Sequence, residues 1–223
     1  MSLIKIKGHI CSSLTSLLYL LFPPSCYICS EYLDDELLVC KKCLKSLKIH
    51  KNENKNHLSV FCYDSNIRVL IHALKYGNRP LIGRIIGREM AKRLKDLLSN
   101  ENSLLVPVPL HKKRLRKRGY NQSRLISEGI SDITSIPVDE SFLTRKTNNV
   151  SQTILGSKER AENVMNIFCS RTLSESEKSK NVYLIDDLIT TGATSKEACK
   201  ALRSAGNEKL FPISAATSSN DFM

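Results

Sequence analysis

The stretch VYLIDDLITTGAT, residues 182–194, constrains the fold more than any other part of the sequence. Its mostly apolar first residues predict a buried β-strand, and the residue spacing over 193–206 predicts a helix that ends at Gly206. A strand that leads directly into a helix is typical of a parallel sheet with helical connections. Between the two lie adjacent carboxylates and a threonine-rich turn, which strand and helix formation alone do not explain.

Strand and helix patterns alternate along most of the chain. Apolar runs of strand length occur at 58–63, 103–110, 140–145, 164–169, 182–186 and 209–217. Helical spacing occurs at 66–77, 80–98, 121–131 and 193–206. This alternation predicts an α/β domain over residues 58–223, with a mostly parallel sheet flanked by helices on both faces. The polar segment before it, residues 48–57, has the composition of a linker.

The two carboxylates lie where an open parallel sheet binds ligands, outside the carboxyl ends of its strands. Gly192 permits a tight turn, and the N–H groups at the start of the following helix favour an anion. The loop therefore offers carboxylates for hydroxyl groups next to a phosphate site, which suits a sugar phosphate. A simple helix cap is the alternative, although a cap needs one side chain. The candidate residues are Asp186, Asp187, Thr190, Thr191, Gly192, Ala193 and Thr194.

A second motif is the array C-x2-C-x10-C-x2-C, formed by Cys26, Cys29, Cys40 and Cys43. Four thiolates complete a tetrahedral zinc site and leave no open position, so we expect a structural Zn2+ within a small zinc finger at residues 25–50. A module of this size buries too little apolar surface to fold without a metal. A redox pair or plain buried thiols are the alternatives. Paired C-x-x-C units also favour a reducing, intracellular compartment.

The first 24 residues predict an amphipathic helix that Pro23 and Pro24 end. Its apolar run is too short and too often interrupted by Ser and Thr to span a bilayer, and the sequence PPSC is a poor signal-peptide cleavage site. We expect this helix to dock on the protein itself, with attachment to a membrane surface as the alternative. The protein is therefore expected in the cytoplasm or peripherally at the inner face of the membrane, and not as an integral membrane protein.

The net charge of +12 is concentrated in one place, because residues 102–127 contain seven basic side chains and no acidic one. Six of these cations lie within residues 112–118, directly after an expected strand. We expect a basic turn there, at the same edge of the sheet as Asp186. The run could be a solvated helix start, a pyrophosphate site or a nucleic-acid surface. Tyr120 is the only aromatic residue next to it in sequence, so a platform for stacking bases has little support.

Several segments together resemble the ComF family of competence proteins. They are LLFPPSCYICS, VLIHALKYGN, VPVPLHKKRLRKRGYNQS, LTRKTNNVSQTILGSKERAENV and the stretch at 182–194, which is similar to the phosphoribosyl pyrophosphate (PRPP) signature of type I phosphoribosyltransferases. The resemblance runs from about Leu17 to Thr217. It implies a zinc finger joined to a phosphoribosyltransferase domain, in a protein tied to DNA uptake in natural transformation.

The resemblance also implies ligands and roles for single residues. PRPP with Mg2+, or a related sugar phosphate, would bind the loop at 186–194, and residues 146–163 resemble the hood loop of phosphoribosyltransferases. The residues that would handle pyrophosphate or belong to the hood are Lys75, Arg118, Arg145 and Gln152, and Tyr76 belongs to the same family pattern as Lys75. The candidates for contact with single-stranded DNA are Lys112, Lys113, Arg114, Arg116 and Lys117. Components of the DNA-uptake machinery are possible partners.

Two classes of function stay open from the sequence. The first is a protein of natural transformation that handles imported single-stranded DNA and retains a PRPP-binding domain. The second is an active phosphoribosyltransferase of nucleotide metabolism with an unknown acceptor. Thr190 occupies the position at which purine-type relatives carry an acid, which argues against purine salvage.

Overall fold

The computed structural model describes residues 24–33, 38–51, 57–99, 101–146 and 167–218, and the structural statements below concern these residues. The chain divides into two compact units, Met1–Ser46 and Leu47–Met223. Apart from Pro24 and Lys146, the expected N-terminal helix at 1–24 and the expected hood loop at 146–163 lie outside the described residues. In the described part of the chain, no helix has the length and apolar character needed to cross a membrane.

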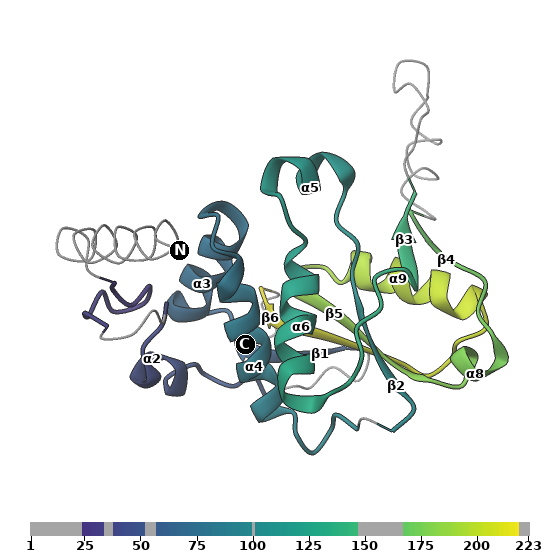
Figure 1. Cartoon of the computed structure of the whole chain (residues 1–223), viewed down its shortest axis with the longest axis horizontal. Coiled ribbons are helices and arrows are strands. Elements are labelled where there is room, and N and C mark those ends of the chain that lie inside the picture. The colour runs from purple at the N-terminus through teal and green to yellow at the C-terminus, as the bar shows by residue number, and fades with distance from the viewer. Residues whose placement is uncertain (1–23, 34–37, 52–56, 100, 147–166, 219–223) are drawn as a thin grey trace, which may run out of the picture. The chain divides into compact units, whose positions relative to one another are not determined.

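The larger unit is built on a four-stranded sheet in the order β1-β6-β5-β2 (Figure 1). Its strands are β1 (Leu58–Cys62), β6 (Leu210–Thr217), β5 (Asn181–Ile189) and β2 (Ser103–Pro107). All three pairings are parallel. The predicted α/β class with a mostly parallel sheet is therefore confirmed.

Helices cover both faces of this sheet. Side chains alternate between the two faces along each strand, so each face presents apolar side chains on which a helix can pack. On one face, Leu104, Val106, Val182 and Leu184 share an apolar cluster with residues of α9 (Ala193–Ser204). On the other face, α6 (Gln122–Thr134) packs against β2 and β5. Two further helices, α3 (Ser65–Tyr76) and α4 (Pro80–Arg93), connect β1 to β2.

The helices α4 and α6 approach until their backbones touch. A Cβ atom added to Gly87 would lie 2.1 Å from the carbonyl oxygen of Ile126, and one added to Gly129 would lie 2.2 Å from that of Arg84. Only glycine fits at these two positions, because a contact this short involves backbone that cannot move aside. This close approach of the two helices fixes the position of α6, whose first turn reaches the ligand site described below.

Two predictions for this unit were wrong. The expected strands at 140–145 and 164–169 do not join the parallel sheet; β3 (Leu143–Arg145) and β4 (Phe168–Ser170) form a separate antiparallel pair that packs on α9. The expected basic turn is a helix, α5 (Lys112–Arg118). The His111 side chain accepts a hydrogen bond from the N–H of Lys113, and Gly119 ends the helix with a φ of 82°. These two end groups define a helix despite repulsion among its cations.

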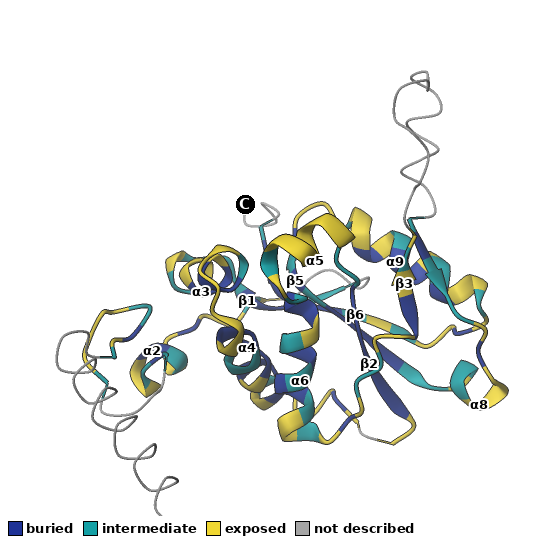
Figure 2. Ribbon diagram, turned by 45° about the horizontal axis from the view of Figure 1, so that its top comes forward, coloured by how far each residue is buried: buried dark blue, intermediate teal, exposed yellow. Residues whose placement is uncertain are grey.

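A short helix, α8 (Glu175–Lys178), precedes β5 and was not predicted. The smaller unit contains an antiparallel bridge between Ser25 and Tyr32 and one short helix, α2 (Lys41–Lys45). Figure 2 contrasts the buried strands of the larger unit with α5, which is exposed from Lys112 to Lys117 and has no buried residue.

Candidate functional site

The carboxylates Asp186 and Asp187 lie within β5 and not after it, because β5 continues to Ile189. Its pairing with β6 continues to Ile189, whereas its pairing with β2 ends at Ile185. The predicted strand end at 186 was therefore wrong on the β6 side of the strand. On the β2 side it is correct, and there the carboxylates border open space at the carboxyl edge of the sheet.

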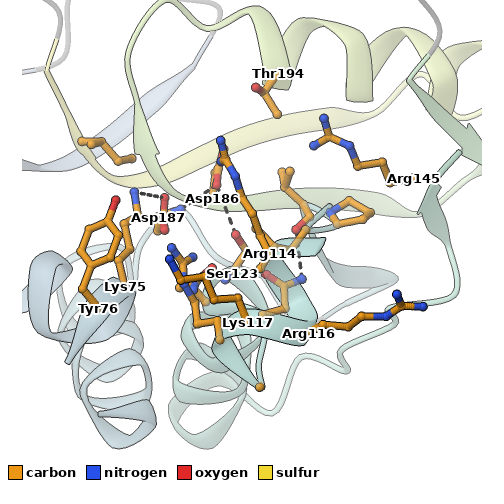
Figure 3. Close-up of a pocket in the computed structure, with 18 of the residues that line it drawn as sticks. Lys75, Tyr76, Arg114, Arg116, Lys117, Ser123, Arg145, Asp186, Asp187 and Thr194 are labelled. Carbon is orange, nitrogen blue, oxygen red and sulfur yellow. Dashed lines mark hydrogen bonds and ion pairs between the residues drawn. The ribbon is translucent and has the colours of Figure 1, made fainter. Parts of the chain in front are cut away.

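That space is a cavity of about 970 Å³ (Figure 3). The predicted residues that line it are Lys75, Arg114, Arg116, Lys117, Arg118, Arg145, Asp186, Asp187 and Thr194. Six other predicted residues do not line it: Lys112, Lys113, Thr190, Thr191, Gly192 and Ala193. Gln152 lies outside the described residues. Residues from four sequence regions, namely the end of α3, α5, Arg145 and the stretch 186–194, thus meet at one edge of the sheet.

Asp187 is held by an ion pair with Lys75 at the C-terminal end of α3, and 3.0 Å separate Nζ from Oδ1. Its side chain is 11% exposed, so the carboxylate is reached from the cavity and hardly from bulk solvent. The pair leaves the second carboxylate oxygen able to accept a hydrogen bond. A ligand hydroxyl group is a suitable donor.

Asp186 accepts hydrogen bonds from the hydroxyl of Ser123, at 3.2 Å, and from the backbone N–H of Asp187, at 2.8 Å. Burial and the adjacent charge of Asp187 raise the pKa of Asp186 to about 7. Ionisation of this carboxyl group destabilises the folded protein, because the charge is less favourable in the folded state than in the unfolded chain, where water solvates it. Such a cost is typical of functional sites.

We expect Asp186→Asn to raise the melting temperature at pH 8 and to change it little at pH 4. The folded pKa of about 7 lies above the ordinary value of 3.8, so the folded state binds its proton more tightly than the unfolded state. The wild-type protein therefore loses stability as the pH rises from 4 through 7, and asparagine, which stays neutral, does not incur this loss. Thermal unfolding across this pH range measures the difference. An equal shift at both pH values would contradict the raised pKa.

Five cations around the cavity have no acidic partner. Within the described residues, the ten ion pairs include none made by Arg114, Arg116, Lys117, Arg118 or Arg145. Burial and the positive charge of Arg114 lower the pKa of Arg145. Guanidinium groups that repel each other across a cavity are stabilised by a shared anion.

The loop after β5 forms the opposite side of the site. Gly192 has a φ of 72° and immediately precedes α9, and it has no side chain to cap that helix. In the first turn, the N–H of Ala193 donates a long hydrogen bond of 3.5 Å to the hydroxyl of Thr191, and the N–H groups after it have no side-chain cap in the described residues. The uncapped N–H groups of this turn can bind an anion. Thr194 lines the cavity, whereas Thr190 and Thr191 are exposed in the loop itself.

Ser123 and Gln122 are residues of the site that the sequence did not indicate. Ser123 and Gln122 lie at the start of α6 and are 4% and 2% exposed, and the side-chain nitrogen of Gln122 is buried without a hydrogen-bond partner in the structure. Tyr76, which the family pattern indicated next to Lys75, lines the cavity from the end of α3. All three occur in segments that carry the family resemblance, but nothing in their local sequence indicates that α3 and α6 converge on β5.

The cysteines of the smaller unit meet the geometric requirements of a zinc centre. Their four Sγ atoms lie within 4.8 Å of one another, and those of Cys29 and Cys40 are 3.9 Å apart. Zinc–sulfur bonds of about 2.3 Å place tetrahedral sulfur atoms about 3.8 Å apart. Burial raises the pKa of Cys26, but hydrogen bonds from backbone N–H groups, the strongest from Cys40, lower it further, to about 6. The thiolate form that binds a metal is therefore favoured at Cys26. The four residues form a structural zinc site.

Comparisons with known proteins bear on the zinc site and on the family of the chain. A model of the double zinc ribbon domain matches residues 17–54. Competence protein F of Haemophilus influenzae is 31% identical over 193 residues, which cover 84% of this chain and 82% of that protein. Competence protein ComFC of Bacillus subtilis is 26% identical and covered over 60% of its length, and DNA utilization protein YhgH of Escherichia coli K12 is 28% identical and covered over 64%. The matched regions cover 68% and 65% of this chain, and less than two thirds of these last two relatives.

Among solved structures, the glutamine PRPP amidotransferase of B. subtilis has a TM-score of 0.45 at 18% identity, over 74% of this chain and 32% of its own. The adenine phosphoribosyl transferase of Trypanosoma brucei has a TM-score of 0.35 at 14% identity, over 79% and 78%. Both scores are below 0.5, and the fold assignment rests on the sheet and helices described above.

Proposed function

This chain belongs to the family of competence protein F, and we propose that it binds PRPP, or a related sugar phosphate, together with single-stranded DNA during the use of imported DNA. Competence and DNA-utilisation proteins are the relatives it resembles over most of its length. The proposal assigns the sugar phosphate to the cavity at the carboxyl edge of the sheet and the DNA to α5.

The separation of charge within the cavity carries the proposal. Asp186 and Asp187 lie together in β5, while α5 and Arg145 contribute to the same cavity five cations that have no acidic partner in the described part of the chain. A sugar phosphate has the complementary arrangement, because its hydroxyl groups donate to carboxylates and its phosphates accept from guanidinium, ammonium and backbone N–H groups. A ligand with phosphates at both ends of a ribose can reach α9 and α5 at once.

The donor set also fits Mg2+ bound with PRPP. Magnesium prefers oxygen ligands and is held by one or two carboxylates together with the phosphates of the substrate. Asp186 and Asp187 are the carboxylates that would hold it, since Lys75 balances only one of their two charges. When bound, the ion would neutralise charge on the pyrophosphate group.

We expect Asp187→Ala to weaken PRPP binding by more than about tenfold in a calorimetric titration, because a ribose hydroxyl loses a charged acceptor. Inorganic pyrophosphate has no ribose, so without Mg2+ it should bind this variant at least as tightly as wild type, since Lys75 is then unpaired. Asp96→Ala is the matched control; it removes the same charge from an exposed position after α4. Unchanged PRPP affinity in Asp187→Ala would contradict the proposed site.

Turnover is a second candidate function, favoured by the cations of α5 that line the same cavity as Asp186. A carboxyl group with a pKa of about 7 can take up or release a proton at neutral pH. The cations of α5 could stabilise a departing pyrophosphate by electrostatic attraction. Release of pyrophosphate from PRPP in the presence of free nucleobases, lost in Asp186→Asn, would establish this activity. Release that is equal with and without protein would exclude it for those acceptors.

A further inference from the structure

The last cation of the basic helix, Arg118, lies over the aromatic ring of Tyr76. The hydroxyl of Tyr120 donates a 2.7 Å hydrogen bond to the carbonyl oxygen of Leu74, which ties the ring of Tyr120 to α3. Tyr76 follows Lys75 at the end of α3, yet its side chain is 71% exposed. Figure 3 shows Lys75 directed at Asp187, with Tyr76 next to it at the rim of the cavity. An exposed ring at this position adds little to the stability of the fold.

Two other side chains accompany the ring. The guanidinium carbon of Arg118 lies 5.6 Å from the centroid of the Tyr76 ring, and the imidazole ring of His72 lies 4.9 Å from it at an interplanar angle of 48°. His72 is itself exposed. Flat groups of this kind are those on which unpaired bases stack, since every base presents a π-face. The cation of Arg118 adds attraction to a stacked base.

The surrounding charge favours one occupant over others. The basic helix α5 ends at Arg118, and its remaining cations are exposed and without acidic partners among the described residues. A nucleic-acid strand whose phosphates contact α5 would place a base next to the ring of Tyr76. Double-stranded DNA hides its bases within the stack, so the combination suits a single strand.

We propose that Tyr76, with Arg118 and His72, is a stacking platform for a base of single-stranded nucleic acid whose phosphates lie on α5. The proposal rests on the DNA contact proposed above and adds to it a base-dependent part of the affinity. This part depends on the aromatic ring and not on charge, so it can be measured separately from the attraction of phosphates.

Two fluorescent oligonucleotides of equal length test the platform, one of thymidines and one whose sugars carry no base. Wild type should bind the thymidine strand at least about fivefold more tightly at one salt concentration, since stacking of a single base has that effect. Tyr76→Ala should abolish the preference and leave the dependence on salt unchanged, whereas Tyr76→Phe should retain it. Phe211→Ala is the matched control, because Phe211 is another partly exposed ring in contact with an aromatic neighbour, Tyr183.

The outcomes separate the platform from the DNA contact itself. Equal affinity of wild type for both strands, or a preference that survives in Tyr76→Ala, would overturn the platform and leave phosphate binding in place. Binding to neither strand would overturn both. Displacement of the thymidine strand by free nucleobases would assign the ring to a small acceptor molecule and would also overturn the proposal.

Discussion

Raising the salt concentration from 0.05 to 0.5 M should lower the affinity for single-stranded DNA by roughly 600-fold, if α5 neutralises about four phosphates at a slope of about −0.7 for each. Counter-ions released from the strand cause this dependence, and a solvated helix start would not produce it. Fluorescence anisotropy with a labelled oligonucleotide, repeated across salt concentrations, measures the slope. No salt-sensitive binding at all would remove DNA contact from the proposed function.

The position of two lysines allows a sharper form of this experiment. Lys112 and Lys113 belong to α5 but do not line the cavity, so their joint replacement by alanine should reduce the magnitude of the slope by about 1.4. PRPP binding should stay as in wild type. The matched control is Lys95→Ala with Lys209→Ala, which removes the same charge from exposed positions before β2 and β6, at the opposite edge of the sheet. Equal slopes in both double variants would show that the attraction is not located on α5.

Removal of zinc should unfold residues 25–46 and leave the parallel sheet intact. Metal binding contributes on the order of 10 kcal/mol to the folding of such modules, far more than their small core. Cys43 is one of only a few buried apolar residues there, so folding depends on the four sulfur–metal bonds. Metal analysis should give about one zinc ion per chain, because residues 17–54 contain ligands for one four-sulfur site.

Hydrogen exchange with and without a chelator locates the effect, and Cys40→Ser should reproduce it without a chelator. Cys62→Ser is the control. Its thiol belongs to the larger unit and donates to the carbonyl oxygen of Ile49, a bond that serine can also make. Protein that is free of zinc and still protected over residues 25–46 would show that the thiols are structural without a metal.

The sequence was most informative where local pattern and global fold agree. The apolar runs at β5 and β6 predicted parallel strands, and the spacing in α4 and α9 predicted their helices. The order of these elements was enough to place Asp186, Asp187 and the basic run at one edge of the sheet. Parallel strands separated by helices leave little choice about which ends meet.

The remaining parts of the site depend on contacts between distant segments. Tyr76 lies beside Arg118 because α3 packs next to the loop that carries α5, and 42 positions separate the two residues in sequence. Ser123 reaches Asp186 across 63 positions. No periodicity or spacing encodes such pairs. The only aromatic residue next to the basic run in sequence is Tyr120, whose hydroxyl bonds within the fold, so a stacking platform had little support from the sequence. The strand end was predicted at 186, whereas β5 pairs with β2 only to Ile185 and with β6 to Ile189, a difference that the sequence of β5 does not indicate.

The contact between α4 and α6 at Gly87 and Gly129 limits how this site can be redesigned. Each glycine meets the carbonyl group of a residue on the other helix, so neither position tolerates a methyl group unless the helices separate. Separation would carry Ser123 away from Asp186, and a library that varied these glycines would lose binders for reasons unrelated to ligand chemistry. Directed evolution toward another phosphorylated ligand should therefore vary α5 and the end of α3, where exposed side chains can change without moving the backbone.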